Sequence, residues 1–451
     1  MKRHLIYGRF GTSDRAEIPL AEGELGTRLP FVQAKRHIDH GIGDAVDDLA
    51  KLGLFPSEVA VDLLVLAAHV QAADTHLSRA TESQDGWTRE IRLVVPVSDP
   101  TGWDRTRPLL QRLLNFLTGD RWIVGFRPRP AGFEQIAPAR PTGSPRAPFD
   151  SLSLFSGGLD SLIWAIDCLE RNKTPLLVSH AGDGATSDSQ GTLVRGLMRN
   201  YPSRNFNRLR IWMDFRGWEV KGVGCEKTSR GRSFLFFAGG VLGGSALDGR
   251  FVLGAPENGL IALNVPLDPL RVGAFSTRTT HPFYVARWNE LLGMLGIPGR
   301  IENPYRDKTK GEMVANCANP SLLASLAPKS LSCSSPTKGR WLGRGTEHCG
   351  FCLPCLIRRA ALRGSDRTSY TLSNLTARDL STRKAQGQQV RSFQFAIARI
   401  QAKPELASLL IHKPGPLSDV GTAEQAALAD VYRRGLAEVG QLLAEVSTTP
   451  D

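Results

Sequence analysis

The stretch best equipped for chemistry is Ser156-Gly157-Gly158-Leu159-Asp160-Ser161. An alternating apolar run precedes it and an apolar helical pattern follows it, so the sequence predicts a strand, a glycine turn and a helix. Two glycines let the backbone curl closely around a ligand, and the N–H groups of a helix start favour an anion. The two serines add hydroxyl donors. Asp160 would repel a bare phosphate, so we expect it either to hold Mg²⁺ or to cap the helix.

This loop lacks the Gly-Lys-Ser/Thr ending of the kinase and GTPase phosphate loop. Ser-Gly-Gly-x-Asp-Ser instead resembles the signature of the PP-loop ATP pyrophosphatases, which cleave ATP between the α- and β-phosphates. The resemblance implies that the segment from Phe155 to Ser161 binds ATP, with Asp160 and Ser161 in catalytic roles. The plainer interpretation is a glycine turn that merely begins a helix.

Strand and helix patterns alternate from residue 151 onward, which predicts a doubly wound α/β fold with a parallel sheet. Candidate strands lie at 151–155, 176–180, 209–215, 250–253 and near Ile301, and candidate helices at 161–171, 189–200, 233–247 and 282–295. Ligands of such sheets bind beyond the carboxyl ends of the strands. His180, which follows the second strand, is therefore a candidate contact for adenosine, and it is equally well explained as a turn residue.

Two basic segments could bind phosphate. Arg230 and Arg232 flank a glycine at a predicted helix start, which suits a second anion site, although two solvated arginines would also explain the pattern. Lys308 and Lys310 begin another predicted helix and could approach the phosphates of ATP or face solvent. We place Arg232 and Lys308 among the catalytic candidates and Arg230 among the residues that bind ATP.

Polar loops after later strands could recognise a heterocyclic ring. Glu257 could accept from a guanine-like pair of N–H donors, while Asn258 or Arg278 could recognise carbonyl groups. Ordinary turn chemistry would also explain the Glu-Asn-Gly run. These three residues are our candidates for binding the substrate.

Four of the seven cysteines, Cys333, Cys349, Cys352 and Cys355, lie close together in the sequence. Two overlapping Cys-x2-Cys units need a fourth ligand, and Cys333 completes the Cys₄ composition of structural zinc sites. An iron–sulfur cluster is the alternative, and His348 is a possible substitute ligand. The predicted knuckle spans residues 333–355.

The chain has 451 residues, enough for two or three domains. We expect an N-terminal α/β or α+β domain at 1–127, a Pro-rich linker at 128–149, the loop-bearing domain at 150–365 and a helical region at 366–451. Residues 1–150 carry 19 basic and 19 acidic side chains, so the net charge of +12 falls on the remainder. That excess suits ATP, other anionic ligands, RNA or an acidic protein. No signal or membrane-spanning pattern is present, so we expect a cytoplasmic protein.

The loop, the knuckle, the Arg-Gly-Arg-Ser helix start and the 308–312 segment together resemble the 7-cyano-7-deazaguanine synthase (QueC) family over residues 150–365. The Pro-Glu-Asn-Gly and Ser-Thr-Arg-Thr-Thr-His-Pro runs and the flanking regions resemble its branch in Qat anti-phage defence, QatC. The resemblance implies an ATP-dependent C–N ligase with ATP, Mg²⁺ and Zn²⁺. Such an enzyme adenylates the carboxylate of 7-carboxy-7-deazaguanine or a related 7-deazaguanine, and an amine then captures the activated acyl group.

This sequence departs from the housekeeping QueC pattern in three ways. Ser233 stands where the family usually has Asn, the spacing from Cys333 to Cys349 is longer, and the two flanking regions have no counterpart. We therefore expect that the amine is either ammonia or an amine of a partner protein in a defence operon. The alternatives are a PP-loop tRNA-modifying enzyme of the thiolation type and a non-catalytic nucleotide-binding subunit of a defence complex.

Overall fold

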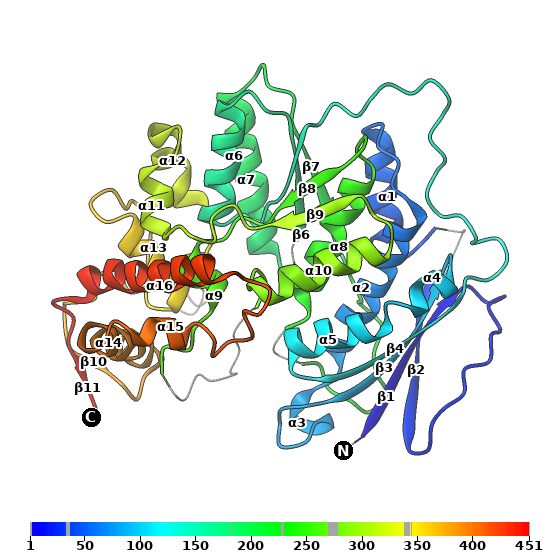
Figure 1. Ribbon diagram of the computed structural model, residues 1–451, viewed down its shortest axis with the longest axis horizontal. Helices are drawn as coiled ribbons and strands as arrows, with labels where there is room; N and C mark the ends of the chain where they lie inside the picture. Colours follow the sequence, from blue (N-terminus) through cyan, green and yellow to red (C-terminus); the bar gives the residue numbers. More distant parts are fainter. Residues whose placement is uncertain are drawn as a thin grey trace.

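A computed structural model describes residues 2–32, 37–180, 182–226, 230–268, 278–337, 343 and 345–450. Two parallel sheets and a helical C-terminal region follow one another across the molecule (Figure 1). The N-terminal sheet lies on one side, the second sheet is central, and the C-terminal helices lie on the other side. The protein is therefore an α/β protein built on parallel sheets, as the alternating patterns predicted.

The N-terminal sheet has the order β2-β1-β3-β4, and all of its pairings are parallel. Its strands are β1 (Arg3–Phe10), β2 (Glu24–Val32), β3 (Glu90–Val97) and β4 (Arg121–Pro128). Its helices are α1 (Ile42–Lys51), α2 (Glu58–His76), α3 (Arg79–Glu82), α4 (Pro100–Asp104) and α5 (Arg107–Thr118). Of the two folds expected for this region, the structure has the α/β one.

Helix α2 joins the N-terminal sheet to the rest of the molecule. It is buried around most of its circumference, as expected for a helix that is apolar on all sides. One continuous hydrophobic core includes Ile6 on β1, Leu64 on α2 and Phe237 on α8 (Arg232–Ser245). The N-terminal region therefore shares a core with the central sheet.

The central sheet has the order β7-β6-β5-β8-β9, again with parallel pairings throughout. Its strands are β5 (Ser151–Leu154), β6 (Pro175–His180), β7 (Asn207–Ile211), β8 (Phe251–Gly254) and β9 (Gly299–Glu302). The chain builds the sheet outward from β5 in one direction and then returns to add β8 on the other side. Such a reversal creates a crevice at the carboxyl ends of the two central strands, where ligands of doubly wound sheets bind.

The other helices between residues 159 and 361 cover the central sheet or extend from it. They are α6 (Leu159–Glu170), α7 (Gly184–Asn200), α9 (Gly259–Leu263), α10 (Pro282–Met294), α11 (Lys310–Ala315), α12 (Pro320–Leu326) and α13 (Leu353–Ala361). The predicted helices at 161–171, 189–200, 233–247 and 282–295 correspond to α6, α7, α8 and α10.

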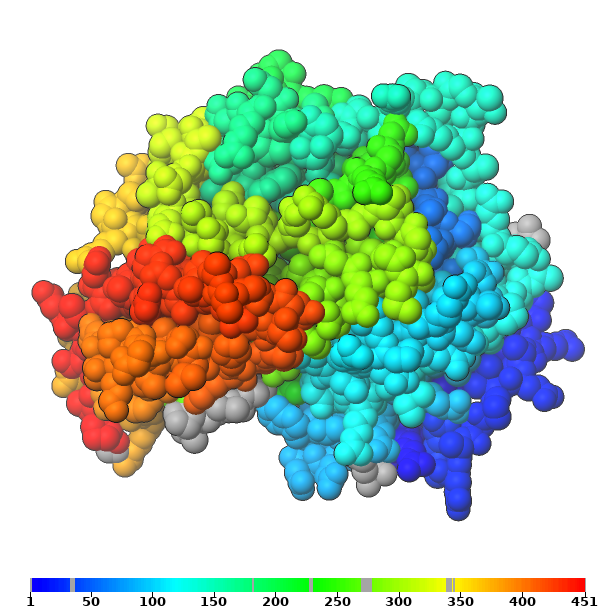
Figure 2. Space-filling model, viewed as in Figure 1, coloured from blue at the N-terminus to red at the C-terminus, as the bar shows by residue number. Residues whose placement is uncertain are grey.

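The C-terminal region packs around α16 (Thr422–Leu443), α14 (Ala385–Ala402) and the short α15 (Leu406–Leu410). A small parallel pair, β10 (Leu380–Ser381) with β11 (Thr448–Thr449), closes it. Figure 2 shows its orange and red surface directly against the yellow-green surface of the central region. Among the described residues, no helix has both the length and the apolar character needed to cross a bilayer.

Candidate functional site

The glycine loop connects β5 to α6 at the crevice where the strand order reverses. Gly157 has φ +82°, a left-handed conformation that favours glycine, and a Cβ at this position would lie 2.9 Å from Gln190 Cγ. Gly158 is the N-cap of α6 and has no side chain to cap it. The Ser156 and Ser161 hydroxyls lie 3.3 Å apart at this turn. The loop thus combines a helix N-terminus with two hydroxyls, an arrangement suited to an oxyanion.

Asp160 lies in the first turn of α6 and faces the loop after β8. Its Oδ2 accepts hydrogen bonds from Asn258 N at 3.0 Å and Asn258 Nδ2 at 2.8 Å. Its Oδ1 lies 2.6 Å from Lys310 Nζ, in an ion pair whose geometry leaves that oxygen without a well-aligned hydrogen bond. Both side chains are buried. A carboxylate oxygen in this position fits the ligand preference of Mg²⁺.

Glu257 lies beside the ion pair of Asp160 and Lys310 at the end of β8. Burial raises the pKa of Glu257 to about 7, and the Asp160 charge adds to the rise, whereas donation from the Thr280 hydroxyl and the Lys310 charge oppose it. Asn303 fixes the backbone, since its Nδ2 donates to Glu257 O at 2.7 Å and its Oδ1 accepts from Glu257 N at 3.2 Å. The site therefore contains a firmly held carboxyl group that titrates near neutral pH.

Because Glu257 titrates, we expect the difference in free energy of unfolding between Glu257→Gln and the wild type to depend on pH. The pKa of Glu257 is higher in the folded protein, about 7 against an ordinary value of 4.5, so the folded state holds the extra proton between these values. The wild-type free energy of unfolding should fall as pH rises through this window. Glu257→Gln lacks the titrating group, so its advantage should grow by about 1–2 kcal/mol between pH 5 and 8, less than the full shift would give because the carboxyl is partly solvated.

Thermal or urea unfolding of both proteins from pH 5 to 8 measures this difference. Glu302→Gln, at the exposed Glu302 of the neighbouring strand β9, is the matched control. A constant difference for Glu257→Gln would contradict the titration.

His180 and Arg232 form the other side of the site. Burial lowers the pKa of His180 to about 4, and the nearby Arg232 charge lowers it further, so the imidazole is neutral at pH 7. Arg232 is exposed to solvent, yet the surrounding protein lowers its pKa by desolvation, which the Asp183 charge opposes. Gln190 links this side to the glycine loop, because its Nε2 donates to His180 O at 3.0 Å and Ser156 O at 3.3 Å.

The side chains of three predicted site residues contact groups other than the glycine loop. The Arg230 guanidinium stacks 4.4 Å from the centre of a Trp87 ring and donates to Thr118 O at 2.8 Å. The Arg278 guanidinium stacks on Phe116 and donates to Phe116 O at 2.6 Å. Lys308 is exposed and lies 3.4 Å from Asp307. The two arginines thus contact the N-terminal region, and Lys310 is the lysine that reaches the loop.

The N-terminal region also supports the helix that carries Arg232. Asp74, which is fully buried, accepts from Gly231 N at 2.6 Å at the start of α8. Arg89 holds the same carboxylate through Oδ1 at 2.8 Å and also pairs with Asp120. This buried ionic network therefore connects the N-terminal sheet to one wall of the site.

The four predicted cysteines come together as one cluster, which confirms that prediction. Their sulfur atoms all lie within 4.8 Å of one another, and Cys333–Cys352 and Cys349–Cys355 are both 3.9 Å apart. Sulfurs at 2.3 Å from a tetrahedral zinc would be about 3.8 Å apart, whereas a disulfide requires about 2.05 Å. The cluster therefore fits a Zn²⁺ site with no disulfide. His348 is not one of the four grouped ligands, but it borders them: its Nδ1 lies 3.7 Å from Cys355 Sγ, while its Nε2 contacts Ser330 O at 2.9 Å.

The cysteine cluster adjoins the glycine loop through the two residues before Cys333. Leu331 N donates to Gly157 O at 2.7 Å, and Leu159 N donates to Ser332 Oγ at 3.3 Å. Ser189 adds a third tie, since its hydroxyl contacts both Gly157 O and Lys329 O. A metal held by the cluster would therefore fix the position of the loop.

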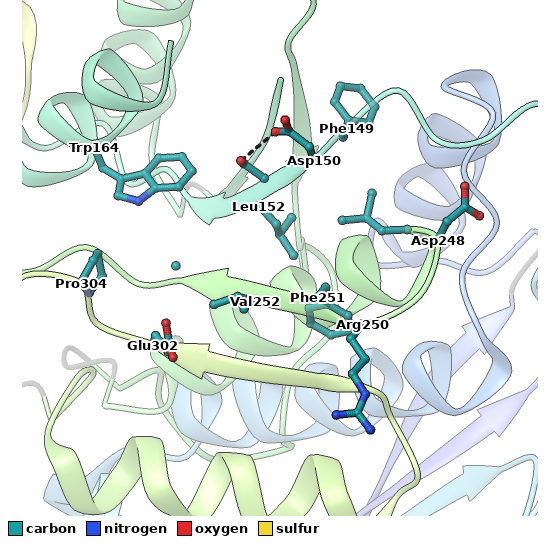
Figure 3. Close-up of a pocket in the computed structure, with 13 residues that line it drawn as sticks. Phe149, Asp150, Leu152, Trp164, Asp248, Arg250, Phe251, Val252, Glu302 and Pro304 are labelled. Carbon is teal, nitrogen blue, oxygen red and sulfur yellow. Dashed lines mark hydrogen bonds between the residues drawn. The ribbon is translucent and has the colours of Figure 1, made fainter. Parts of the chain in front are cut away.

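A separate hollow of about 360 Å³ lies on the central sheet, between Trp164 of α6 and strands β5, β8 and β9 (Figure 3). Leu152, Val252 and Glu302 line it, while the glycine loop and the other predicted site residues do not. Asp150 at its rim accepts from the Ser151 hydroxyl at 2.8 Å. This hollow is thus distinct from the candidate site.

Sequence patterns do not single out every residue that builds the site. They name Lys310 beside Lys308 but place only Lys308 among the catalytic candidates, although the Thr309–Glu312 capping box puts Lys310 in the first turn of its helix. Thr280 and Asn303 carried no comparable signal, since only the folded chain brings them to Glu257. Ser276 and Thr277 of the predicted polar run, and residues 227–229 beside Arg230, lie outside the described residues.

The glycine loop and its surroundings form a candidate anion site at the N-terminus of α6. Asp160, Glu257, the buried Lys310 and Arg232 border it. Helix N-termini and cationic side chains of this kind favour anionic ligands. No protein-family model, no curated protein and no solved structure matches this chain. The assignment of a function therefore depends on the geometry of the site and on the sequence motifs.

Proposed function

We propose that this protein is a QueC-like PP-loop enzyme that uses ATP to adenylate the carboxylate of a 7-deazaguanine and then transfers the acyl group to an amine. The observation that carries the proposal is the position of Ser156–Ser161 at the crevice between β5 and β8, with Asp160 paired to Lys310. Doubly wound sheets bind nucleotides at this crevice.

In the proposed reaction, a carboxylate oxygen of 7-carboxy-7-deazaguanine attacks the α-phosphorus of ATP and pyrophosphate leaves. The first turn of α6 and the loop hydroxyls bind the departing phosphates. Lys310 and Arg232 stabilise the negative charge that builds on them. Asp160 is the residue that would hold Mg²⁺, which neutralises phosphate charge when bound. After this step the acyl carbon carries AMP, which leaves readily when an amine attacks, in place of the oxide of the carboxylate, which is a poor leaving group.

The second half-reaction forms a C–N bond. An amine nitrogen attacks the acyl carbon, AMP leaves with the electron pair of the C–O bond, and the nitrogen loses a proton. Asn258 and Glu257 are the proposed contacts for the deazaguanine ring. The acceptor we propose is an amine of a partner protein in anti-phage defence, with ammonia as the small-molecule alternative.

The test is pyrophosphate release from ATP with and without 7-carboxy-7-deazaguanine, with mass spectrometry of the nucleobase and of any partner protein. We expect the deazaguanine to stimulate release, and we expect a mass gain on the partner or, with ammonia, an amide, which a second ATP could dehydrate to the nitrile. Stimulated release without a small product would place the acceptor on a protein. The absence of any stimulation would overturn the proposed reaction.

The thiolation alternative is less well supported by the remaining cysteines. Such enzymes need a reactive thiolate, and burial raises the pKa of Cys168 to about 11 and of Cys317 to about 12. The four clustered cysteines would be occupied by the proposed zinc. Cys225 is exposed and is the remaining thiol that such a reaction could use.

A further inference from the structure

Helix α16 of the C-terminal region holds the start of α11, the helix that carries Lys310. Glu438 accepts from Gly311 N at 3.2 Å through Oε2 and from the Thr309 hydroxyl through Oε1. Thr309 and Gly311 are the residues on either side of Lys310. The carboxylate of Glu438 thus contacts both neighbours of the lysine, the side chain of Thr309 and the backbone of Gly311.

A second residue of α16, one turn earlier, holds the rest of the same segment. Arg434 forms an ion pair with Glu312 and donates to Asp307 O at 3.1 Å. Thr309 and Glu312 are the two members of the capping box of α11. Arg434 and Glu438 lie on one face of α16 because they are four residues apart. Both halves of the capping box are therefore tied to the C-terminal region.

The position of Lys310 matters because its ammonium group is buried and has little freedom. Its side chain is 6% exposed, and Nζ lies 2.6 Å from Asp160 Oδ1. A shift of about 1 Å in a group that stabilises charge can cost about a hundredfold in rate. The α11 segment is short, so its own helical hydrogen bonds contribute little to holding it in place.

We propose that Glu438 is a positioning residue for Lys310, so that the C-terminal region completes the nucleotide site. The effect on turnover rests on the proposed function, whereas the effect on Lys310 does not. This assignment gives the C-terminal region a role, which its sequence pattern alone did not reveal.

The first test measures Lys310 without any activity assay. Wild type and Glu438→Gln are treated with an acetylating N-hydroxysuccinimide ester, and acetylation of Lys310 is followed by peptide mass spectrometry. Glutamine has one acceptor oxygen where glutamate has two, so its NH2 group would face one of the two donors, and we expect Lys310 to react about tenfold faster in the variant. Arg433→Gln is the matched control, because Arg433 neighbours this face, is 42% exposed and pairs with Asp430. Equal labelling of wild type and Glu438→Gln would overturn the proposal.

The second test uses turnover and separates positioning from general destabilisation. We expect Glu438→Gln to lower kcat for pyrophosphate release by about 10–100-fold while KM for ATP changes less than about threefold. In a Lys310→Ala background the same substitution should cost nothing more. An equal loss in that background would show a merely structural role and overturn the proposal.

Glu438→Asp provides a second variant if Glu438→Gln does not fold. It keeps the charge and both acceptor oxygens but shortens their reach, so we expect labelling and kcat between those of wild type and Glu438→Gln. Wild-type values for Glu438→Asp in both measurements, with the protein folded, would also count against positioning. Absence of pyrophosphate release by the wild type would refute the proposed function and leave the labelling test to decide the role of Glu438.

Discussion

Replacing Asp160 with asparagine is expected to lower kcat for pyrophosphate release by about a thousandfold or more. Asparagine preserves the shape of the side chain and one acceptor for Asn258, but it removes the charge that faces Lys310 and the oxygen proposed to bind Mg²⁺. The variant should also be less stable. Breaking a buried ion pair by removing one partner costs about 3–5 kcal/mol, because it leaves the other charge uncompensated.

A double variant separates the loss of activity from the loss of stability. Asp160→Asn with Lys310→Met removes both charges, so unfolding experiments should show most of the stability restored, while pyrophosphate release stays as slow as in Asp160→Asn. Asp167→Asn is the control on the same helix, since Asp167 accepts from Ala318 N at 2.8 Å outside the site. We expect it to retain near wild-type kcat. Pyrophosphate release by Asp160→Asn at the wild-type rate would rule out a central role for this carboxylate.

Local sequence patterns predicted the central sheet and the loop because their signals span only a few residues. A short apolar strand, two glycines and an apolar helix identify the β5–α6 turn without any tertiary information. Strand β3 carries the same kind of local signal, because its alternating apolar residues match a strand with one face buried. The parallel arrangement followed from the alternation of strands and helices.

The first two strands were not predicted, for physical reasons that the structure makes clear. β2 contains Pro30, which argues against a central strand, but β2 is an edge strand where a missing N–H is tolerated. β1 is central and buried on both faces over His4–Ile6, so it lacks the alternation of a half-exposed strand. In the C-terminal region, predicted to be helical over 366–451, the first helix begins at Ala385, after the short strand β10.

Contacts between distant parts of the chain decide where the basic side chains of the predicted site lie. Arg230 and Arg278 were predicted from local basic patterns, yet their guanidinium groups pack on Trp87 and Phe116 of the N-terminal region. Nothing near residue 230 in the sequence indicates that Trp87 lies beside it. The same holds for Asp74 at the start of α8, whose buried network with Arg89 exists only in the folded chain.

Substitution of one of the four clustered cysteines is expected to affect both zinc content and folding stability, and the cluster is hydrogen-bonded to the glycine loop through the residues before Cys333. We expect the wild type to contain about one zinc per chain and Cys355→Ser to lose it. Three thiolates and a serine form an incomplete site, and structural zinc contributes several kcal/mol to folding. Metal analysis and thermal unfolding measure both effects. Cys225→Ser, at an exposed cysteine outside the cluster, should retain its zinc and its wild-type melting temperature.

The link to the loop predicts more than a loss of stability. Cys333 immediately follows Leu331 and Ser332, which bond to Gly157 O and Leu159 N, so loss of the metal should disorder the proposed phosphate site. ATP binding by Cys355→Ser should therefore weaken even at a temperature where the rest of the chain is folded. A wild-type protein that is brown and contains iron would contradict the assignment of zinc to the four cysteines. A zinc-free variant that binds ATP as the wild type does would show that the loop holds its shape without the cluster, and that Ser189 and Gln190 are sufficient to support it.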